Sequence, residues 1–239
     1  AQSGFSIIGG QKIDRYSIYV DRKRSLAKEW DLGYGMSYRF AKDRDFQTYD
    51  KVTGDIPTEN TDSRLREQTA NVYVSLSKNY ATGTSVSISA TGEYYTIGNY
   101  RKWAVYPQAS LTYVKSSEHL FQFSLSTDKT YPGYWDMQSS VSHLNGYTEL
   151  WGTPGLKPST AYNLNGNYIW KQKYIFGLFF MHTSDFFVQT GYQSTDRLAL
   201  IYKNTNWNYM QMWGTNVILP FKAGNWLDSR LTLVGMQVH

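Results

Sequence analysis

The sequence predicts an all-β chain, an antiparallel up-and-down meander that forms part of a transmembrane β-barrel. Three observations in its 239 residues lead to this fold class. Apolar and polar residues alternate with a period of two over most of the chain, short polar turns separate the alternating runs, and the polar faces carry mainly Ser, Thr, Asn and Gln. A strand with one apolar and one polar face is the unit that such a barrel repeats.

The composition agrees with this fold class without deciding it. The chain holds 21 Tyr, 8 Trp and 11 Phe, so that 17% of its residues are aromatic, yet its mean hydropathy is −0.51. Rings spread through a polar chain are typical of membrane strands with aromatic girdles at the two interfaces. A soluble glycan-binding β-sandwich is also rich in Tyr and Trp, so composition alone leaves that alternative open.

The alternating runs are the strands that we expect, and with their connections they amount to about ten or eleven. In two neighbouring runs the apolar face should meet lipid and the serine face should point inward. The lipid-facing residues are Val72, Val74, Leu76, Val86, Ile88 and Ala90, and the inward residues are Ser75, Ser77, Ser87 and Ser89. The clearest runs cover residues 30–40, 71–77, 85–95, 103–115, 162–170, 207–219 and 226–238.

The joints between the runs predict how the strands are connected. Residues 79–83, 115–118 and 171–173 are short polar turns of antiparallel hairpins, and no crossover that would allow parallel pairing is visible. Residues 43–64 form a long polar segment, which predicts a loop. Short turns that alternate with long loops are typical of outer-membrane barrels, in which the long loops lie outside the cell.

Residues 179–181 and 186–187 depart from this pattern because they place apolar groups on both strand faces. Such a strand fits a lumen surface covered by something else, for example a plug, and it equally fits the core of a sandwich. The neutral polar faces elsewhere favour the barrel, since the exposed face of a sandwich strand would carry mixed Lys and Glu.

A stretch near the middle of the chain resembles a known family. It reads YPGYW at 131–135, GY at 146–147 and WGTPGLKPS at 151–159, and it follows a Gly-Glu at 92–93 and a Tyr-Pro at 106–107. This order resembles the outer-membrane β-barrel family of Bacteroidetes, which is the barrel region of TonB-dependent receptors. Thr153 stands where that family usually has Asn.

The resemblance implies a function, a location and a set of partners. It implies part of a receptor or transporter barrel in the bacterial outer membrane, which takes up an unknown nutrient ligand. Its partners would be outer-membrane lipid and a TonB-type energy coupler that acts through a plug region. Residues 1–239 read as a single β-barrel segment without a recognisable plug, so the resemblance implies an incomplete barrel, about half of one.

The motif also provides the candidate site residues. Pro cannot donate to a sheet ladder and Gly permits tight reversals, so we expect a rigid connection. Its structural residues are Pro132, Tyr134, Trp135, Gly152, Pro154, Leu156 and Pro158. The ligand contacts that we expect are the loop aromatics Trp135, Tyr147 and Trp151.

We expect no enzyme, no catalytic residue, no cofactor and no metal site. The four histidines show no metal-ligand spacing, and His182 with Ser184 stands in no catalytic motif. The chain has no Cys, and its net charge of +5 is scattered, which argues against nucleic-acid binding. Two alternatives to the receptor remain: a soluble or surface glycan-binding β-sandwich, and a structural outer-membrane barrel.

Overall fold

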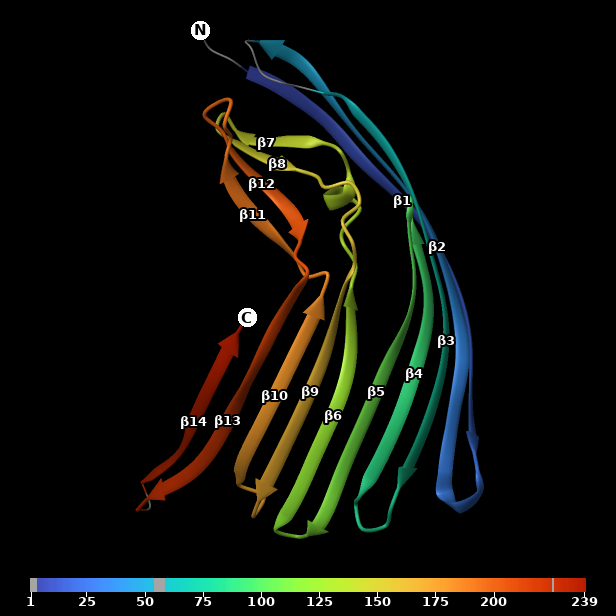
Figure 1. The fold of residues 1–239 in the computed structure, drawn as a ribbon, viewed down its shortest axis with the longest axis vertical. Coiled ribbons are helices and arrows are strands. Elements are labelled where there is room, and N and C mark those ends of the chain that lie inside the picture. Colours follow the sequence, from blue (N-terminus) through green and yellow to red (C-terminus); the bar gives the residue numbers. More distant parts are fainter. Residues whose placement is uncertain (1–3, 54–58, 225) are drawn as a thin grey trace.

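The computed structural model describes residues 4–53, 59–224 and 226–239, and these are almost entirely strand (Figure 1). The only helical elements among them are two short 3-10 turns, η1 (Ala27–Glu29) and η2 (Trp135–Met137). The strands are β1 (Gly4–Ser25), β2 (Trp30–Thr53), β3 (Thr61–Asn79), β4 (Ser85–Ile97), β5 (Tyr100–Ser116), β6 (His119–Thr130), β7 (Val141–Asn145), β8 (Thr148–Trp151), β9 (Ser159–Trp170), β10 (Tyr174–Ser184), β11 (Phe187–Gln193), β12 (Leu200–Asn206), β13 (Tyr209–Ala223) and β14 (Leu227–Val238).

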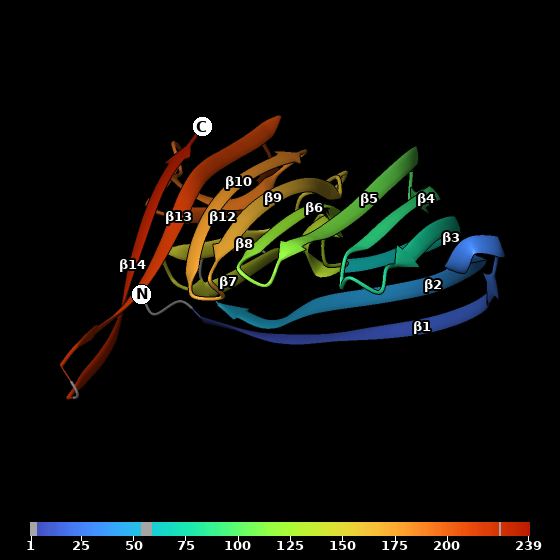
Figure 2. The ribbon, with the colours of Figure 1, turned by 90° about the horizontal axis from the view of Figure 1, so that it is seen from below.

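Ten of these strands form one large sheet, which we call the wall. Its order is β1-β2-β3-β4-β5-β6-β9-β10-β13-β14, and every neighbouring pair is antiparallel. Seen from below, the wall is a curved sheet that runs round from β1 to β14 (Figure 2). The predicted antiparallel meander is confirmed, and the ten wall strands agree with the number expected from the alternating runs.

The remaining four strands form a second sheet, which we call the inner sheet, in the order β11-β12-β8-β7. It is built from the two longest connections of the wall, β6 to β9 and β10 to β13 (Figure 1). The pair β12–β8 is parallel, from Leu200 opposite Thr148 to Lys203 opposite Trp151. The expectation of antiparallel pairing alone was therefore wrong. β8 and β12 belong to different connections of the wall, and the chain between them includes the wall strands β9 and β10. These wall strands provide the crossover that parallel pairing requires.

The predicted loop over residues 43–64 was also wrong for residues 43–53 and 61–64, since β2 continues to Thr53 and β3 begins at Thr61. Residues 54–58 of that prediction lie outside the described residues. The ladder runs from Asp43 opposite Leu65 to Gln47 opposite Thr61. Polar residues occupy this extension because part of it is covered by the inner sheet: Gln47 is 2% exposed, and its Nε2 donates to the carbonyl of Val141 at 3.0 Å.

The turns at the lower end of the wall in Figure 1 are short, as predicted. They span residues 80–84, 117–118 and 171–173, and Gly83 adopts a φ of +84° in the first of them. The two longest connections lie at the other end. By the usual wiring of outer-membrane barrels, the short turns mark the periplasmic rim and the long connections the outer rim.

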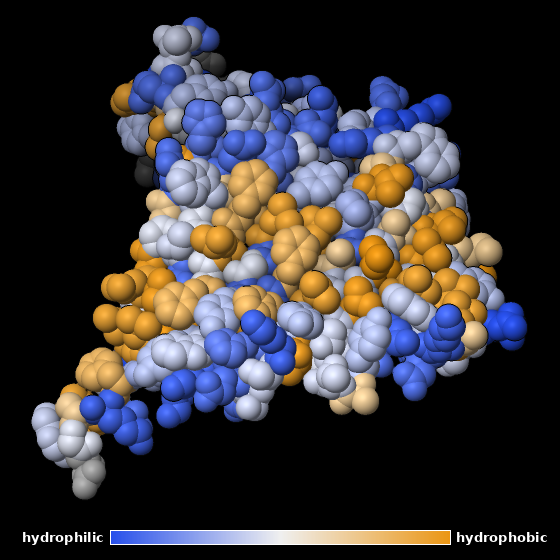
Figure 3. Space-filling model, turned by 60° about the horizontal axis from the view of Figure 1, so that its bottom comes forward, coloured by the Kyte–Doolittle hydropathy of each residue, from blue (hydrophilic) through white to orange (hydrophobic). Residues whose placement is uncertain are grey.

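The two faces of the wall differ as the alternation predicted. Val72, Val74 and Ile88 are half-exposed or more on the outward face, and Ser75 pairs with Ser89 on the other. Hydrophobic residues gather in a band across the molecule, with hydrophilic residues on both sides of the band (Figure 3). No helix within the described ranges is long and apolar enough to cross a membrane.

A small core lies between the wall and the connections that fold against it. Tyr95 and Ile97 of β4 pack with Met137 and Leu156 from the connection between β6 and β9. Phe187, at the start of β11, packs against the same cluster. Phe187 thus packs between the wall and the chain's own inner connections, which agrees with the first of the two alternatives that the sequence left open.

Candidate functional site on the inner face of the wall

The motif segment, residues 131–159, folds back on itself on the inner side of the wall. Gly152 donates its N–H to the carbonyl of Ser140 at 3.0 Å, and Thr153 donates its N–H to the carbonyl of Asp136 at 2.6 Å. An added Cβ on Gly152 would lie 2.0 Å from the carbonyl oxygen of Gln138. Only glycine permits this close approach of two backbone stretches.

Other motif residues fix the segment by burial and by backbone conformation. Leu156 is 2% exposed, Pro132 and Pro158 are buried, and Gly155 has a φ of +83°. Thr153, which departs from the family pattern, donates its hydroxyl to the carbonyl of Asn204 in β12. Pro154 is exposed at the tip of the reversal. These contacts support the rigid connection expected from the Pro and Gly residues.

Lys129 of β6 sits in a cage of three tyrosines. Its Nζ lies 4.3 Å from the ring centroid of Tyr95, 4.6 Å from that of Tyr131 and 5.7 Å from that of Tyr106. The ammonium also pairs with the carboxylate of Glu93, and the side chains of Lys129 and Glu93 are 9% and 6% exposed. A buried cation held by one carboxylate and by ring faces ties β4, β5 and β6 together.

Phenols from the motif segment bind wall carboxylates. Tyr131 donates its hydroxyl to Glu93 at 2.7 Å, and Tyr134 donates its hydroxyl to Glu67 of β3. Burial, followed by the hydrogen bond to Glu67, raises the pKa of Tyr134 to about 12. Burial and the bond to Glu93 likewise raise the pKa of Tyr131. Both phenols therefore remain neutral donors at physiological pH and anchor the segment to the wall.

A pocket of about 410 Å³ opens beside these anchors on the inner face. Trp135 of η2 forms one side of it, together with the rings of Tyr131 and Tyr134. Arg15 of β1 and Arg39 of β2 line it from the wall. The Arg39 guanidinium lies 5.7 Å from the ring centroid of Tyr131. The pocket thus offers flat apolar surface next to two guanidinium groups.

The inner sheet has a polar centre of its own at Glu149 of β8, which is 2% exposed. Arg197 binds both of its carboxylate oxygens, at 2.6 and 2.7 Å. Trp151 donates its indole N–H to the same carboxylate at 2.9 Å, and His143 Nε2 lies 3.4 Å from it. The hydroxyl of Tyr49 in β2 is 3.2 Å from His143 Nδ1, which joins the inner sheet to the wall.

The three aromatics predicted as ligand contacts lie in three different surroundings. Trp135 lines the inner pocket. Trp151 is half-buried, with its N–H engaged by Glu149. Tyr147 is 65% exposed in the turn between β7 and β8. No aromatic pair or hydrogen bond joins any two of them within the described ranges, and the ligand role of all three stays a prediction.

The charged residues at the centre of this site could not be assigned a role from the sequence. Glu93, Lys129, Glu67 and Glu149 stand in no catalytic or metal motif. One signal was present for Glu93, which is the only acidic residue on a strand face that is otherwise Ser and Thr over 85–93. Lys129 gave no such signal, because its partners come from strands distant in sequence.

This architecture is similar to that of known outer-membrane proteins. The model of the outer membrane protein beta-barrel family matches residues 6–238. Among solved structures, the siderophore receptor PirA from Pseudomonas aeruginosa is 12% identical with a TM-score of 0.62, over 95% of this chain and 43% of that one. The copper transporter OprC is 12% identical with a TM-score of 0.61, over 96% and 39%. The FrpB iron transporter from Neisseria meningitidis is 11% identical with a TM-score of 0.56, over 95% and 36%.

The chain therefore spans about two fifths of the length of these solved structures, and at such low identity they show the fold alone. No curated protein matches the chain. The family model matches almost all of it, with the wall, the apolar band and the inner connections already described. An origin in Bacteroidetes stays a prediction. The chain belongs to the outer membrane protein beta-barrel family, and its place is the bacterial outer membrane.

Proposed function

We propose that this chain is part of the barrel of a TonB-dependent receptor that takes up a nutrient ligand across the outer membrane. One observation carries the proposal. The two longest connections do not lie free outside the wall but fold into an inner sheet around the buried Glu149, which Arg197 binds. The motif segment is anchored to the wall beside a pocket by hydrogen bonds from Tyr131 and Tyr134. Such a fixed inner surface suits selective binding, which a passive pore does not need.

The lining of the pocket indicates the chemistry of the ligand. Arg15 and Arg39 offer guanidinium groups for anionic oxygens, and Trp135, Tyr131 and Tyr134 offer ring faces for flat apolar surface. A ligand with both features, such as a metal chelate with aromatic oxygen donors, fits this pocket. The similar solved structures include an iron transporter, a siderophore receptor and a copper transporter, which supports testing chelated metals first.

The energy for uptake would come from a TonB-type coupler that acts through a plug domain elsewhere in the intact protein. The chain itself then works as receptor and wall rather than as an enzyme. This part of the proposal is supported by the resemblance of the motif at 131–159 and by the similarity to receptor barrels.

Uptake by cells tests the proposal. Cells with and without the gene are given labelled ferric siderophores and copper, with and without a protonophore. We expect deletion to abolish uptake of at least one of these ligands and the protonophore to abolish the same uptake. Uptake that depends on the gene but is insensitive to the protonophore would instead show a passive barrel.

The pocket is tested separately by Trp135→Ala, with Trp103→Ala as the matched control. Trp103 is 77% exposed on the outward face, far from the pocket lining. We expect Trp135→Ala to lower ligand binding, at about 1–3 kcal/mol for the loss of one stacking ring, and Trp103→Ala to leave it unchanged. Equal binding by both variants would remove Trp135 from the site.

A further inference from the structure

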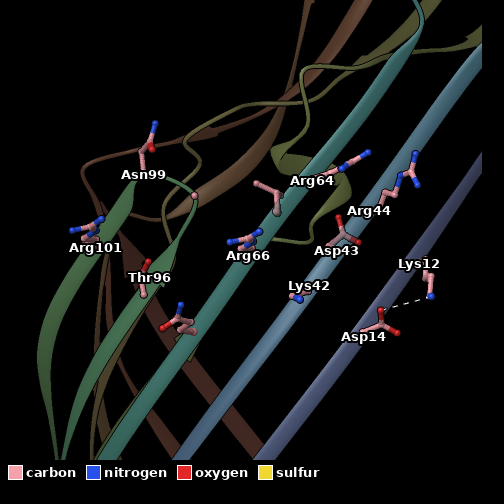
Figure 4. Close-up of a pocket in the computed structure, with 13 residues that line it drawn as sticks. Lys12, Asp14, Lys42, Asp43, Arg44, Arg64, Arg66, Thr96, Asn99 and Arg101 are labelled. Atoms are coloured by element: carbon pink, nitrogen blue, oxygen red, sulfur yellow. Dashed lines mark ion pairs between the residues drawn. The ribbon is translucent and has the colours of Figure 1, made fainter.

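Six cationic side chains gather on the outward face of the wall, near the rim that carries the long connections (Figure 4). All six are exposed and line a groove of about 800 Å³ that extends over β1, β2, β3, β4 and β5. We call them the basic patch, and they are Lys12, Lys42, Arg44, Arg64, Arg66 and Arg101.

The strand register brings the cations of the basic patch directly opposite one another. Lys42 of β2 is the partner of Arg66 in β3, and Arg44 is the partner of Arg64. Like charges at directly opposed positions destabilise a sheet. Two such pairs side by side are therefore a cost to the folded wall unless an anion lies over them.

The chain's own carboxylates cover only part of this charge. Asp62 binds Arg44 at 2.8 Å and lies 3.7 Å from Arg64, and Asp14 lies 3.8 Å from Lys12. Within the part of the chain that the structure describes, the other three cations form no ion pair. They are Lys42, Arg66 and Arg101.

The basic patch borders the apolar band on the same face of the same strands. Along β2, Lys42 is followed two residues down by Phe40, whose ring centroid lies 5.5 Å from the ammonium. Along β5, Arg101 is followed by Trp103, which is 77% exposed and packs on Tyr94 with ring centroids 4.6 Å apart. Rings between cations and apolar side chains mark the level of lipid head groups in a membrane wall.

We propose that the basic patch binds the phosphate groups of a glycolipid in the outer leaflet. The acyl chains of this lipid would lie along the apolar band of β2 and β3, and its phosphates would sit over Lys42, Arg66 and Arg101. Clustered Lys and Arg beside a membrane surface attract anionic head groups, and Arg binds phosphate with two parallel hydrogen bonds. This site lies on the opposite face of the wall from the ligand pocket and is independent of uptake.

Binding of defined lipids to the protein in detergent micelles tests this proposal. The probes are a bis-phosphorylated lipid A, the same lipid after enzymatic removal of its phosphates, and inorganic phosphate. We expect the phosphorylated lipid to bind and the dephosphorylated lipid to bind at least tenfold more weakly. Equal binding of the two lipids would overturn the proposal. Inorganic phosphate that binds as tightly as the lipid would overturn the assignment to a lipid.

Two sets of variants locate the site. The triple variant Lys42→Gln, Arg66→Gln, Arg101→Gln should weaken binding of the phosphorylated lipid by about fivefold per cation, or about a hundredfold in all. The matched control removes three exposed cations at the rim with the short turns and should leave binding unchanged; it is Arg22→Gln, Lys115→Gln, Lys173→Gln. Equal weakening by both sets would show a general charge effect and sink the assignment.

The substitution Asp62→Asn should change binding of the phosphorylated lipid in the opposite direction. This substitution removes the carboxylate that neutralises Arg44 and Arg64, so binding of the phosphorylated lipid should tighten.

The stability of the triple variant gives a further test. Without lipid, the triple variant should unfold no more easily than the wild type, because one like-charge pair is gone. It should also lose the stabilisation that the lipid gives the wild type. A triple variant that the lipid still stabilises fully would overturn the proposal.

Discussion

At the scale of single residues, the inner site depends on a glycine whose surroundings leave no space for a side chain and on a buried ion pair. Gly152 permits two backbone stretches to meet, and the carboxylate of Glu93 pairs with the buried ammonium of Lys129. The role of Gly152 in a tight reversal could be predicted from the sequence, because Gly and Pro fix the backbone locally. The pair of Glu93 and Lys129 could not be predicted, because the partners of Lys129 meet only when β4, β5 and β6 are side by side.

Gly152→Ala should destabilise the fold. Its Cβ would lie 2.0 Å from the carbonyl oxygen of Gln138, and backbone atoms cannot turn aside as a side chain can. Overpacking of this kind costs about 1–3 kcal/mol, and sometimes more. Unfolding by denaturant in detergent micelles measures it. Gly166→Ala in β9 is the control, since a Cβ there meets nothing within 4 Å, and it should be neutral or slightly stabilising.

Glu93→Gln should cost about 3–5 kcal/mol of unfolding free energy, because it leaves the Lys129 ammonium buried without its carboxylate. Adding Lys129→Met should restore much of the loss. The exposed pair of Lys222 and Asp228 is the control, and Lys222→Gln should change stability by about 0–1 kcal/mol. A double variant no more stable than Glu93→Gln alone would show that the ammonium is not what destabilises it.

At the scale of the strands, period-two alternation predicted the wall well and the regions beyond the membrane poorly. The runs over 71–77 and 85–95 were assigned correctly because lipid and lumen impose opposite polarities on successive residues. The extension of β2 past Asp43 was missed because charged and polar residues predominate on both of its faces, so that Phe46 and Val52 do not form an alternating run. The strands of the inner sheet were missed because they are short, from 4 to 7 residues, and hold too few alternations to stand out.

Val74→Arg and Ser75→Arg test the orientation of β3. Val74 is 50% exposed on the outward face, and Ser75 points to the other side. Arg on the lipid face near the middle of the bilayer should cost about 2–4 kcal/mol, and Arg at Ser75 should cost less because water reaches the lumen. Folding titrations in lipid vesicles compare the two variants. Equal losses at both positions would contradict the assigned faces.

At the scale of the whole molecule, the wall has two edges. Within the described ranges β1 pairs only with β2, and β14 pairs only with β13. Lipid cannot satisfy the unpaired backbone groups of such an edge. We therefore expect both edges to pair in the membrane with further strands of the same protein, with another copy or with each other.

Residues 1–239 alone should not be a well-behaved monomer in plain buffer. The two edges and the exposed apolar band, which includes Ile18, Val72 and Leu233, favour self-association in water. Light scattering on the chain with and without detergent measures its size, and we expect large species that detergent disperses. A monodisperse monomer without detergent would contradict the membrane assignment and favour the soluble sandwich.

The parallel pairing of β12 with β8 has a consequence for how the molecule forms. These strands are held together across about fifty residues of chain, which include the wall strands β9 and β10. Contacts of such high sequence separation are slow to form, because the entropy of closing the loop is lost before the contact stabilises anything. The wall should therefore assemble first by adding neighbouring hairpins, and the inner sheet should close last. A chain caught before that final step would already be inserted in the membrane, yet the inner sheet would not cover the polar end of β2, where Gln47 binds the carbonyl of Val141.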